Sequence, residues 1–390
     1  MSVWVSVLLG ELVEVKGGKR LPLGHKLQIE KNSAPYIRIV DFDGGIIDQS
    51  KMLYVPTQTQ PLIERYRVAH GDVCISIVGT VGVVGVIPKS LDGAFLTENA
   101  AKLTSFEPVL NASYLSHVLR SSDGQNSIRE QTVGSTQPKL ALHRIREISI
   151  PLPPIGVQKA IAEVLGALDD KIAANTKLVQ TSDELAGVLT RRALDFENRV
   201  PLSSVAQVTM GSSPPGVTLN EVGAGEVFYQ GVRDFGVRFP VNRVWTTGPV
   251  RFAEKLDTLL SVRAPVGRAN LAQERTCIGR GIASIRSIEA HPYSIFHRLR
   301  DDPEMWAPYE AEGTVFGSIN RGQLDKLAMP AILADDSDRL EAQLAAIELR
   351  VASALAENCA LAATRDALLP QLMSGKLRVR DAEKAVQALV

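Results

Sequence analysis

The chain carries the same irregular pattern of residues twice, about 190 positions apart. The matched pairs are Tyr36/Tyr229, Asp41/Asp234 and Phe42/Phe235 at an offset of 193, Asp72/Asp257, Ser76/Ser261 and Gly82/Gly267 at 185, and Gly134/Gly313, Ile145/Leu324, Ile148/Leu327 and Pro151/Pro330 at 179. An offset that shrinks in steps indicates that the second copy has shorter loops. Solenoid repeats have about 20–50 residues, so this much longer period predicts a duplicated domain.

Length and composition suit a globular protein of two or three domains. The chain has 390 residues, of which 45% are hydrophobic and 22% charged. Its apolar runs are shorter than the roughly 20 residues that span a bilayer, and no signal peptide is evident, so we expect no membrane contact. Cys74, Cys277 and Cys359 are widely spaced among apolar neighbours. We expect three reduced core thiols and a cytoplasmic location.

Charge is segregated along the chain although the formal net charge is zero. Residues 228–300 contain eleven Arg and one Lys against five acids, whereas residues 335–367 contain seven acids against three Arg. A neutral total therefore does not exclude a polyanionic partner. The pattern indicates that one part of the chain meets such a partner and another part does not.

The pattern predicts an α+β fold with four segments. Residues 1–152 and 199–332 have short β-branched runs separated by Gly and Pro, which is typical of small twisted sheets in a mixed α/β domain. Residues 153–198 and 333–390 have helical periodicity instead. We therefore expect two duplicated domains separated by two long helices, with pseudo-two-fold symmetry.

Each long helix has one apolar stripe. The stripe residues are Ile161, Leu165, Leu168, Ile172, Val179, Ala186 and Leu189 in the first helix, and Leu340, Leu344, Ile347, Val351, Leu355, Leu361 and Leu368 in the second. Because the chain returns through a whole domain between them, the stripes predict an antiparallel coiled coil. The alternative is that each helix packs on its own domain. Pro370, followed by Gly375, predicts the end of the second helix.

Motifs for catalysis are missing. Gly375-Lys376 lacks the upstream glycine of a Walker A loop, and the six His have no usual metal-ligand spacing. No Gly-x-Ser-x-Gly elbow is present, and Pro153-Pro154 lacks the flanking residues of an adenine methyltransferase loop. Glu14-Val15-Lys16 has a spacing that some nucleases use, but it lies at the end of an amphipathic segment. We expect a chain that performs no chemistry itself.

Several segments resemble the specificity (S) subunits of type I restriction–modification systems, the HsdS family. The segments are 148–154 (Ile-Ser-Ile-Pro-Leu-Pro-Pro) with Gln158, 364–377 (Thr-Arg-Asp-Ala-Leu-Leu-Pro-Gln-Leu-Met-Ser-Gly-Lys-Leu), 261–267 (Ser-Val-Arg-Ala-Pro-Val-Gly), 279–281 (Gly-Arg-Gly), and Gly71-Asp72 with Ser76 and Gly79-Thr80. The resemblance covers nearly the whole chain. The second junction, 329–336, departs from the family pattern because it lacks the Pro-Pro and the Gln.

The resemblance implies a non-catalytic, DNA-reading subunit. Residues 1–152 and 199–332 would be target-recognition domains for the two halves of a bipartite double-stranded DNA target. The helices would be spacers that dock two methyltransferase (M) subunits, which carry S-adenosylmethionine. Two restriction (R) subunits would add ATP- and Mg-dependent cleavage, although a complex without them fits the sequence equally well. The alternative class is a scaffold with twin interaction domains that does not bind DNA.

Polar and basic residues at turn positions are the candidates for contact with DNA. They are Lys19, Arg20, Arg38, Thr80, Gln137 and Lys139 in the first copy, and Ser212, Ser213, Arg233, Arg263, Arg268, Arg280, Ser318 and Asn320 in the second. Arg suits a bidentate contact with guanine, and Gln or Asn suits adenine. Since at least half of protein–DNA hydrogen bonds go to phosphate and sugar, many of these residues are expected to contact only the backbone.

Overall fold

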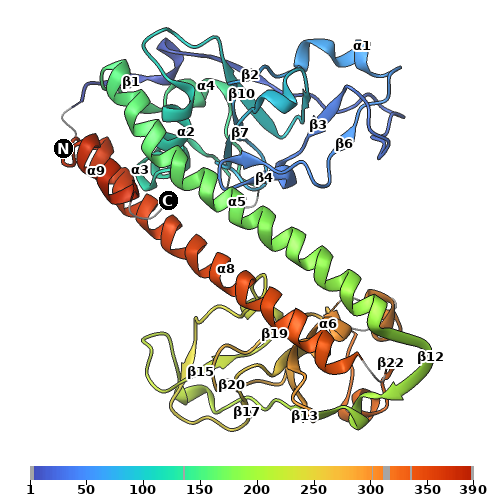
Figure 1. Ribbon diagram of the computed structural model, residues 1–390. Coiled ribbons are helices and arrows are strands. Elements are labelled where there is room, and N and C mark those ends of the chain that lie inside the picture. Colours follow the sequence, from blue (N-terminus) through green and yellow to red (C-terminus); the bar gives the residue numbers. More distant parts are fainter. Residues whose placement is uncertain (1–3, 135–136, 301, 311–316, 334–335, 388–390) are drawn as a thin grey trace. The chain divides into compact units, whose positions relative to one another are not determined.

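The computed structural model describes residues 4–134, 137–300, 302–310, 317–333 and 336–387 (Figure 1). Gly313 of the repeat pattern lies outside the described residues. The chain divides into two units. Unit 1 contains Met1–Asn175 and Glu357–Val390, and unit 2 contains Thr176–Ala356. Each unit contains one β-rich domain and one part of both long helices.

In its first 153 positions, as far as these are described, unit 1 contains short strands, four short helices and several single 3-10 turns. Its strands are β1 (Ser6–Leu8), β2 (Glu14–Gly17), β3 (Pro35–Ile37), β4 (Phe42–Asp43), β5 (Ile46–Ile47), β6 (Leu53–Tyr54), β7 (Val73–Ser76), β8 (Val84–Val86), β9 (Phe95–Leu96), β10 (Ala100–Thr104) and β11 (Ser149–Pro151). Its short helices are α1 (Gln60–Ile63), α2 (Ala112–Arg120), α3 (Ser122–Gln131) and α4 (Leu142–Arg146).

The central sheet of unit 1 is antiparallel, in the order β2-β10-β7-β8. All four residues of β7 are buried. Val73 and Ile75 face one apolar cluster while Cys74 faces another, because successive side chains of a strand point to opposite faces. Burial on both faces explains why three of the four residues of β7, Val73, Cys74 and Ile75, are apolar in succession.

Unit 2 also contains short strands, short helices and single 3-10 turns. Its strands are β12 (Leu194–Pro201), β13 (Ala206–Met210), β14 (Leu219–Asn220), β15 (Glu226–Tyr229), β16 (Trp245–Thr246), β17 (Phe252–Ala253), β18 (Thr258–Ser261), β19 (Ala269–Leu271), β20 (Thr276–Ile278), β21 (Ile282–Ser287) and β22 (Ala328–Ile332). Its short helices are α6 (Pro292–Arg300) and α7 (Arg321–Asp325).

The two β-rich domains have equivalent strand pairings. The sheet β13-β21-β18-β19 corresponds in chain order to β2-β10-β7-β8. The parallel pair β15/β20 corresponds to β3/β9, and the antiparallel pair β12/β22 to β1/β11. The expected α+β fold with a duplicated domain is therefore confirmed.

Two long helices, α5 (Ile155–Ala193) and α8 (Ser337–Met373), pack together as expected. In unit 1, Asn175 donates a hydrogen bond to Glu357 (2.7 Å) and Asp169 pairs with Arg365. In unit 2, Val179 packs with Val351, while Ala186 and Ala193 pack with Leu340 and Leu344. Partners run in opposite chain directions in each unit, so the helices are antiparallel there. The predicted apolar stripes are buried or partly buried.

The predicted end of the second helix at Pro370 is wrong, because α8 continues to Met373. Proline removes one backbone donor, but Leu369, Leu372 and Met373 enter the core of unit 1 and stabilise this last turn. Gly375, at φ +72°, then allows the chain to leave the helix. A further helix that the sequence analysis missed, α9 (Val379–Gln387), packs Ala382 and Val386 into the same core.

One cysteine prediction is also wrong. All three cysteines are free thiols, but only Cys74 and Cys277 are buried, whereas Cys359 on α8 is exposed. Its apolar neighbours in the sequence suggested a core position. In an antiparallel helix pair, however, only one stripe faces the partner, and Cys359 does not lie on it.

A mostly buried carboxylate joins the β-rich domain of unit 1 to the helix pair. Asp169 of α5 accepts hydrogen bonds from Arg120, at the end of α2, and from Arg365 of α8, both at 2.7 Å. Burial alone would raise the pKa of Asp169, but these hydrogen bonds together hold it below its usual value. His117 of α2 lies 3.9 Å from the same carboxylate. Burial lowers the pKa of His117 to about 4, so the imidazole is neutral at pH 7.

Unit 2 has an equivalent cluster with one more charge. Asp183 of α5 pairs with Arg300, at the end of α6 (2.8 Å), and also with Arg238. Arg238 is fully buried and lies 3.2 Å from Glu348 of α8, which also bonds His297 at 2.8 Å. His117/His297 and Arg120/Arg300 share an offset of 180. A His-x-x-Arg pair in each copy could therefore have revealed these clusters.

Replacing Asp169 by Asn should lower the free energy of unfolding of unit 1 by about 3 kcal/mol, because it leaves two arginines mostly buried without their carboxylate. Hydrogen exchange of the α2 amides under mild denaturant measures this loss. The control is Asp170→Asn, an exposed neighbour whose change should cost less than about 0.5 kcal/mol. Equal effects of the two changes would contradict a stabilising role for the cluster.

Stability of unit 1 should fall as the pH drops from about 6.5 towards 4. In this window the unfolded chain binds a proton at His117 that the folded chain does not, so the loss reaches about 2 kcal/mol at pH 5. Asp169, whose pKa is lowered, adds a loss only at still lower pH. Chemical denaturation at pH 7 and pH 5 measures the difference. His117→Gln should reduce it, and exposed His143→Gln should leave it unchanged.

Candidate functional site

A glycine in each copy lets one loop cross closely over a second segment of backbone. Gly18 donates to the carbonyl of Ala100 and Lys19 to that of Leu96, both at 2.9 Å. In unit 2, Gly211 donates to Ile282 and Ser212 to Ile278, also at 2.9 Å. We call these the crossing loops, residues 18–20 and 211–213. A Cβ on Gly18 would lie 2.1 Å from a carbonyl oxygen, and one on Gly211 2.2 Å, so glycine is required at both positions.

The crossing loop of unit 1 presents an arginine held by a carboxylate. Arg20 Nε donates to Glu98 at 2.8 Å, although the Arg20 side chain is 79% exposed. The other carboxylate oxygen of Glu98 accepts from Thr97 (3.1 Å) and Tyr36 (3.4 Å). Burial tends to raise the pKa of Glu98, but the hydrogen bonds from Arg20, the backbone and Thr97 keep it lowered. Glu98 is therefore ionised at neutral pH.

Equivalent positions in unit 2 carry different side chains. Ser213 corresponds to Arg20, and Arg280 corresponds to Glu98. The Ser213 hydroxyl accepts from Arg280 Nε (3.3 Å) and lies 3.2 Å from the Gln230 amide. The two crossing loops thus share a backbone framework but offer different groups at their surfaces.

A buried serine shapes a second loop in each copy. Ser76 donates to the carbonyl of Thr80 (2.5 Å) and accepts from the Val83 amide (2.8 Å). Ser261 does the same with Pro265 (2.7 Å) and Arg268 (2.8 Å). We call these the serine loops, residues 76–83 and 261–268. The sequence repeat contained both serines, but the site prediction missed their role.

The serine loops bring several predicted residues together. Val78 bridges to Lys139 in unit 1, and Arg263 bridges to Ser318 in unit 2. Thr80, Gln137 and Lys139 are all exposed in unit 1. Arg263, Arg268 and Ser318 are exposed in unit 2. Each serine loop therefore lies beside a second segment, and both carry exposed polar residues.

Other predicted residues are engaged within the fold. Half-buried Arg38 pairs with Asp41 (2.7 Å) and donates to the carbonyl of Lys51. Asn320 accepts from the Gln323 amide (3.0 Å) and so caps α7. Arg233 is exposed on a single 3-10 turn. Local structure explains Arg38 and Asn320 without any ligand, whereas Arg233 remains available to one.

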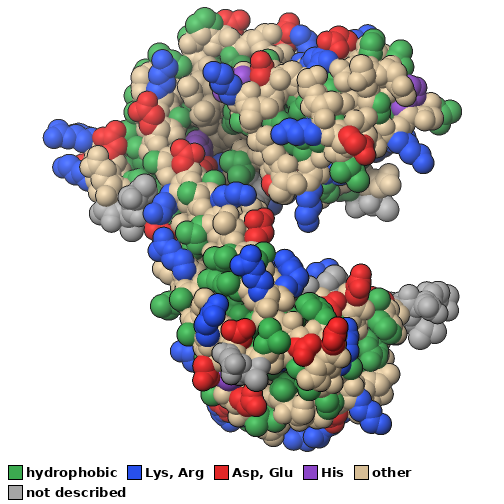
Figure 2. All heavy atoms as spheres, turned by 45° about the vertical axis from the view of Figure 1, so that its right-hand side comes forward, with side chains coloured by type: hydrophobic (Ala, Val, Ile, Leu, Met, Phe, Trp, Pro, Cys, Tyr) green, Lys and Arg blue, Asp and Glu red, His purple; other side chains and the backbone are tan. Residues whose placement is uncertain are grey.

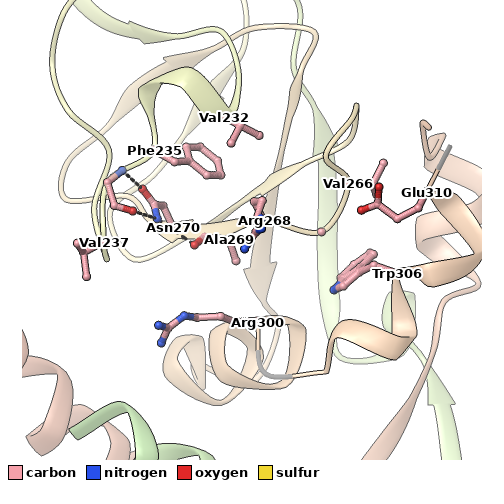
Figure 3. A pocket seen from close by; sticks show the side chains of 12 residues that line it. Val232, Phe235, Val237, Val266, Arg268, Ala269, Asn270, Arg300, Trp306 and Glu310 are labelled. Carbon is pink, nitrogen blue, oxygen red and sulfur yellow. Dashed lines mark hydrogen bonds between the residues drawn. The ribbon is translucent and has the colours of Figure 1, made fainter. Parts of the chain in front are cut away.

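A pocket of about 440 Å³ lies beside the serine loop of unit 2. Its lining combines two arginines, two aromatic rings and an acid, namely Arg268, Arg300, Phe235, Trp306 and Glu310. Figure 3 shows Arg268 and Arg300 at the pocket, from separate elements. Arg300 forms an ion pair with Asp183. Arg268 is instead an exposed residue of the serine loop.

In the described part of the chain, no group of three or more His, Cys, Asp or Glu is arranged so that it could hold a metal ion. Among the same residues, no helix has both the length and the apolar character needed to cross a membrane. On the face shown in Figure 2, Lys and Arg side chains are interspersed with Asp and Glu. Charge alone therefore does not outline a site on that face.

Known proteins resemble the chain over one domain and over its full length. Residues 1–181 match the family model described as the type I restriction modification DNA specificity domain. A relative from Methanocaldococcus jannaschii, described as "Putative type I restriction enzyme MjaX specificity subunit", is 25% identical over 95% of this chain and 93% of its own length. The type I restriction enzyme MjaVIII specificity subunit of the same organism is 22% identical over 45% of this chain and 41% of its own length.

A solved structure has the same fold. The type I restriction-modification system S subunit from M. genitalium covers 95% of this chain and 96% of its own length, with a TM-score of 0.60 and 15% identity. The match to the family model identifies a type I restriction modification DNA specificity domain in residues 1–181. Over nearly its full length the chain is similar to type I restriction enzyme specificity (HsdS) subunits, in agreement with the resemblance found in its sequence.

Proposed function

We propose that each β-rich domain reads one half of a bipartite double-stranded DNA target. The observation that carries this proposal is the pair of crossing loops, because one backbone framework presents Arg20 and Glu98 in unit 1 but Ser213 and Arg280 in unit 2. Two copies of one framework with different exposed groups suit two different half-sites. Base edges in the major groove distinguish sequences through the donor and acceptor groups that face them.

The helices would dock two methyltransferase subunits. Large apolar side chains are exposed on both helices of unit 2, namely Leu185 (50%) and Val188 (40%) of α5 and Leu349 (74%) of α8. Exposed apolar surface of this kind suits a protein partner. S-adenosylmethionine would belong to the methyltransferase subunits, and ATP and Mg to restriction subunits where these are present.

Methylation-aware sequencing of cells that contain the chain and its methyltransferase partner tests this function. We expect a single two-part motif with an unread gap. A chain that instead served as a scaffold without DNA contact would give no motif. Its complex would also lack the steep salt dependence of binding to duplex DNA that contact with phosphates produces.

Replacing exposed Arg233 or Arg268 by Ala should weaken binding of the complex to its cognate duplex. A base contact is worth about 1–3 kcal/mol of discrimination, whereas a phosphate contact weakens all sequences alike and lowers the salt slope by about one. Competition binding with cognate and altered duplexes separates these outcomes. Arg339→Ala, an arginine paired with Asp336 at the start of α8, is the control and should not change DNA affinity. Unchanged affinity in both test variants would remove both residues from the site.

Lengthening the helices should lengthen the unread gap. The test inserts four residues after Val179 of α5 and four after Ala354 of α8, which lies in the same apolar cluster. Each helix then becomes about 6 Å longer, which is close to the rise of two base pairs of DNA. The inserted length nearly preserves helical phase, so both half-sites should stay unchanged. The methylation motif reports the result. Four residues inserted after Gly223, in a turn of unit 2, are the control and should leave the gap unchanged. A changed half-site with an unchanged gap would place specificity in the helices.

A further inference from the structure

The crossing loop of unit 1 contains an exposed arginine whose orientation is fixed. Its backbone is anchored because the Lys19 amide donates to Leu96 (2.9 Å) and the Lys19 carbonyl accepts from Tyr36 Oη (2.9 Å). Its side chain is held at Nε by Glu98. With Nε occupied, the outer edge of the Arg20 guanidinium, with its two Nη groups, is the edge that can meet a ligand.

Glu98 is itself held rigidly. One of its oxygens accepts from Arg20, while the other accepts from Thr97 and Tyr36, and Tyr36 is buried. An exposed surface arginine does not need so many fixed contacts for stability, because an exposed ion pair contributes little. The arrangement suits an arginine that must be held in one geometry.

The neighbouring carboxylate decides which part of DNA suits Arg20. A phosphate contact depends on net positive charge, and Glu98 at 2.8 Å neutralises most of that charge and repels phosphate. A base contact depends instead on a fixed fork of donors, which matches the O6 and N7 acceptors of guanine. Base contact is therefore favoured over phosphate contact.

We propose that Arg20, positioned by Glu98, reads a guanine in the half-site of the first domain. This inference rests on the proposed function and names one specificity-determining residue and one positioning residue within it. The second domain has Ser213 and Arg280 at the equivalent places, with Gln230 beside them. The same base position of its half-site is therefore read by different groups.

The test uses the chain in complex with its methyltransferase partner. Arg20→Ala should reduce discrimination for guanine at one position of one half-site by about 10- to 100-fold and leave the other half-site unchanged. Glu98→Gln should also reduce discrimination at that position. In addition, it should increase affinity for unrelated DNA and steepen the salt slope by about one, because it removes a negative charge next to the duplex. Competition binding against a set of single-base variants, together with the methylation motif, measures these effects.

Arg129→Ala, which changes an exposed arginine of α3 in the same unit, is the matched control and should leave motif and affinity unchanged. Uniform weakening on all sequences by Arg20→Ala, with a shallower salt slope, would overturn the inference in favour of a phosphate contact. An unchanged motif in both Arg20→Ala and Glu98→Gln would also overturn it. The absence of any motif with the unaltered chain would instead refute the proposed function itself.

Discussion

Asp169 and Asp183, each facing two arginines, determine where the β-rich domains attach to the helices. Apolar contacts alone would allow a domain to shift slightly along the helices. A mostly buried carboxylate must instead stay paired with its arginines, because an unpaired buried charge costs folding free energy. In unit 1 this contact connects the helices to the serine loop through two packed elements. Asp169 fixes α2, and α2 packs on β7 and β8, which flank the serine loop. In unit 2, Asp183 fixes α6, which packs on β18 and β19 around the equivalent loop.

The duplicated framework separates stability from recognition. Residues that the two copies share are structural: glycines at the crossing loops, serines inside the serine loops, and the His-x-x-Arg pairs at the helices. The surface groups on and beside the crossing loops differ, with Arg20 and Glu98 in unit 1 but Ser213 and Arg280 in unit 2. Mutation at these exposed positions costs little stability, so specificity can change while the framework stays intact.

Much of the fold could be predicted from periodicity, because apolar stripes and β-branched runs reflect local rules. The apolar stripes of both long helices are an example. Pro370 and Cys359 were misjudged because tertiary contacts decide them: the core of unit 1 stabilises the last turn of α8, and only one helix face meets the partner. The candidate site was harder to predict. Residue type did not reveal that Arg38 forms an ion pair and that Asn320 caps a helix, and the contact between Glu98 and Arg20 depends on the fold because the two residues are 78 positions apart.

The first unit is discontinuous in the sequence, and this has a consequence for synthesis. Its core includes Leu361, Leu372 and Val386 together with residues of the first 175 positions, whereas unit 2 is one unbroken segment between them. A ribosome makes chains from the N-terminus, and domains commonly fold in that order. Here the order is reversed, because the later-made unit can complete its core while the earlier one still lacks its last helices. If translation ended shortly before residue 357, the released chain would therefore have a folded second unit and a first unit with an exposed apolar core.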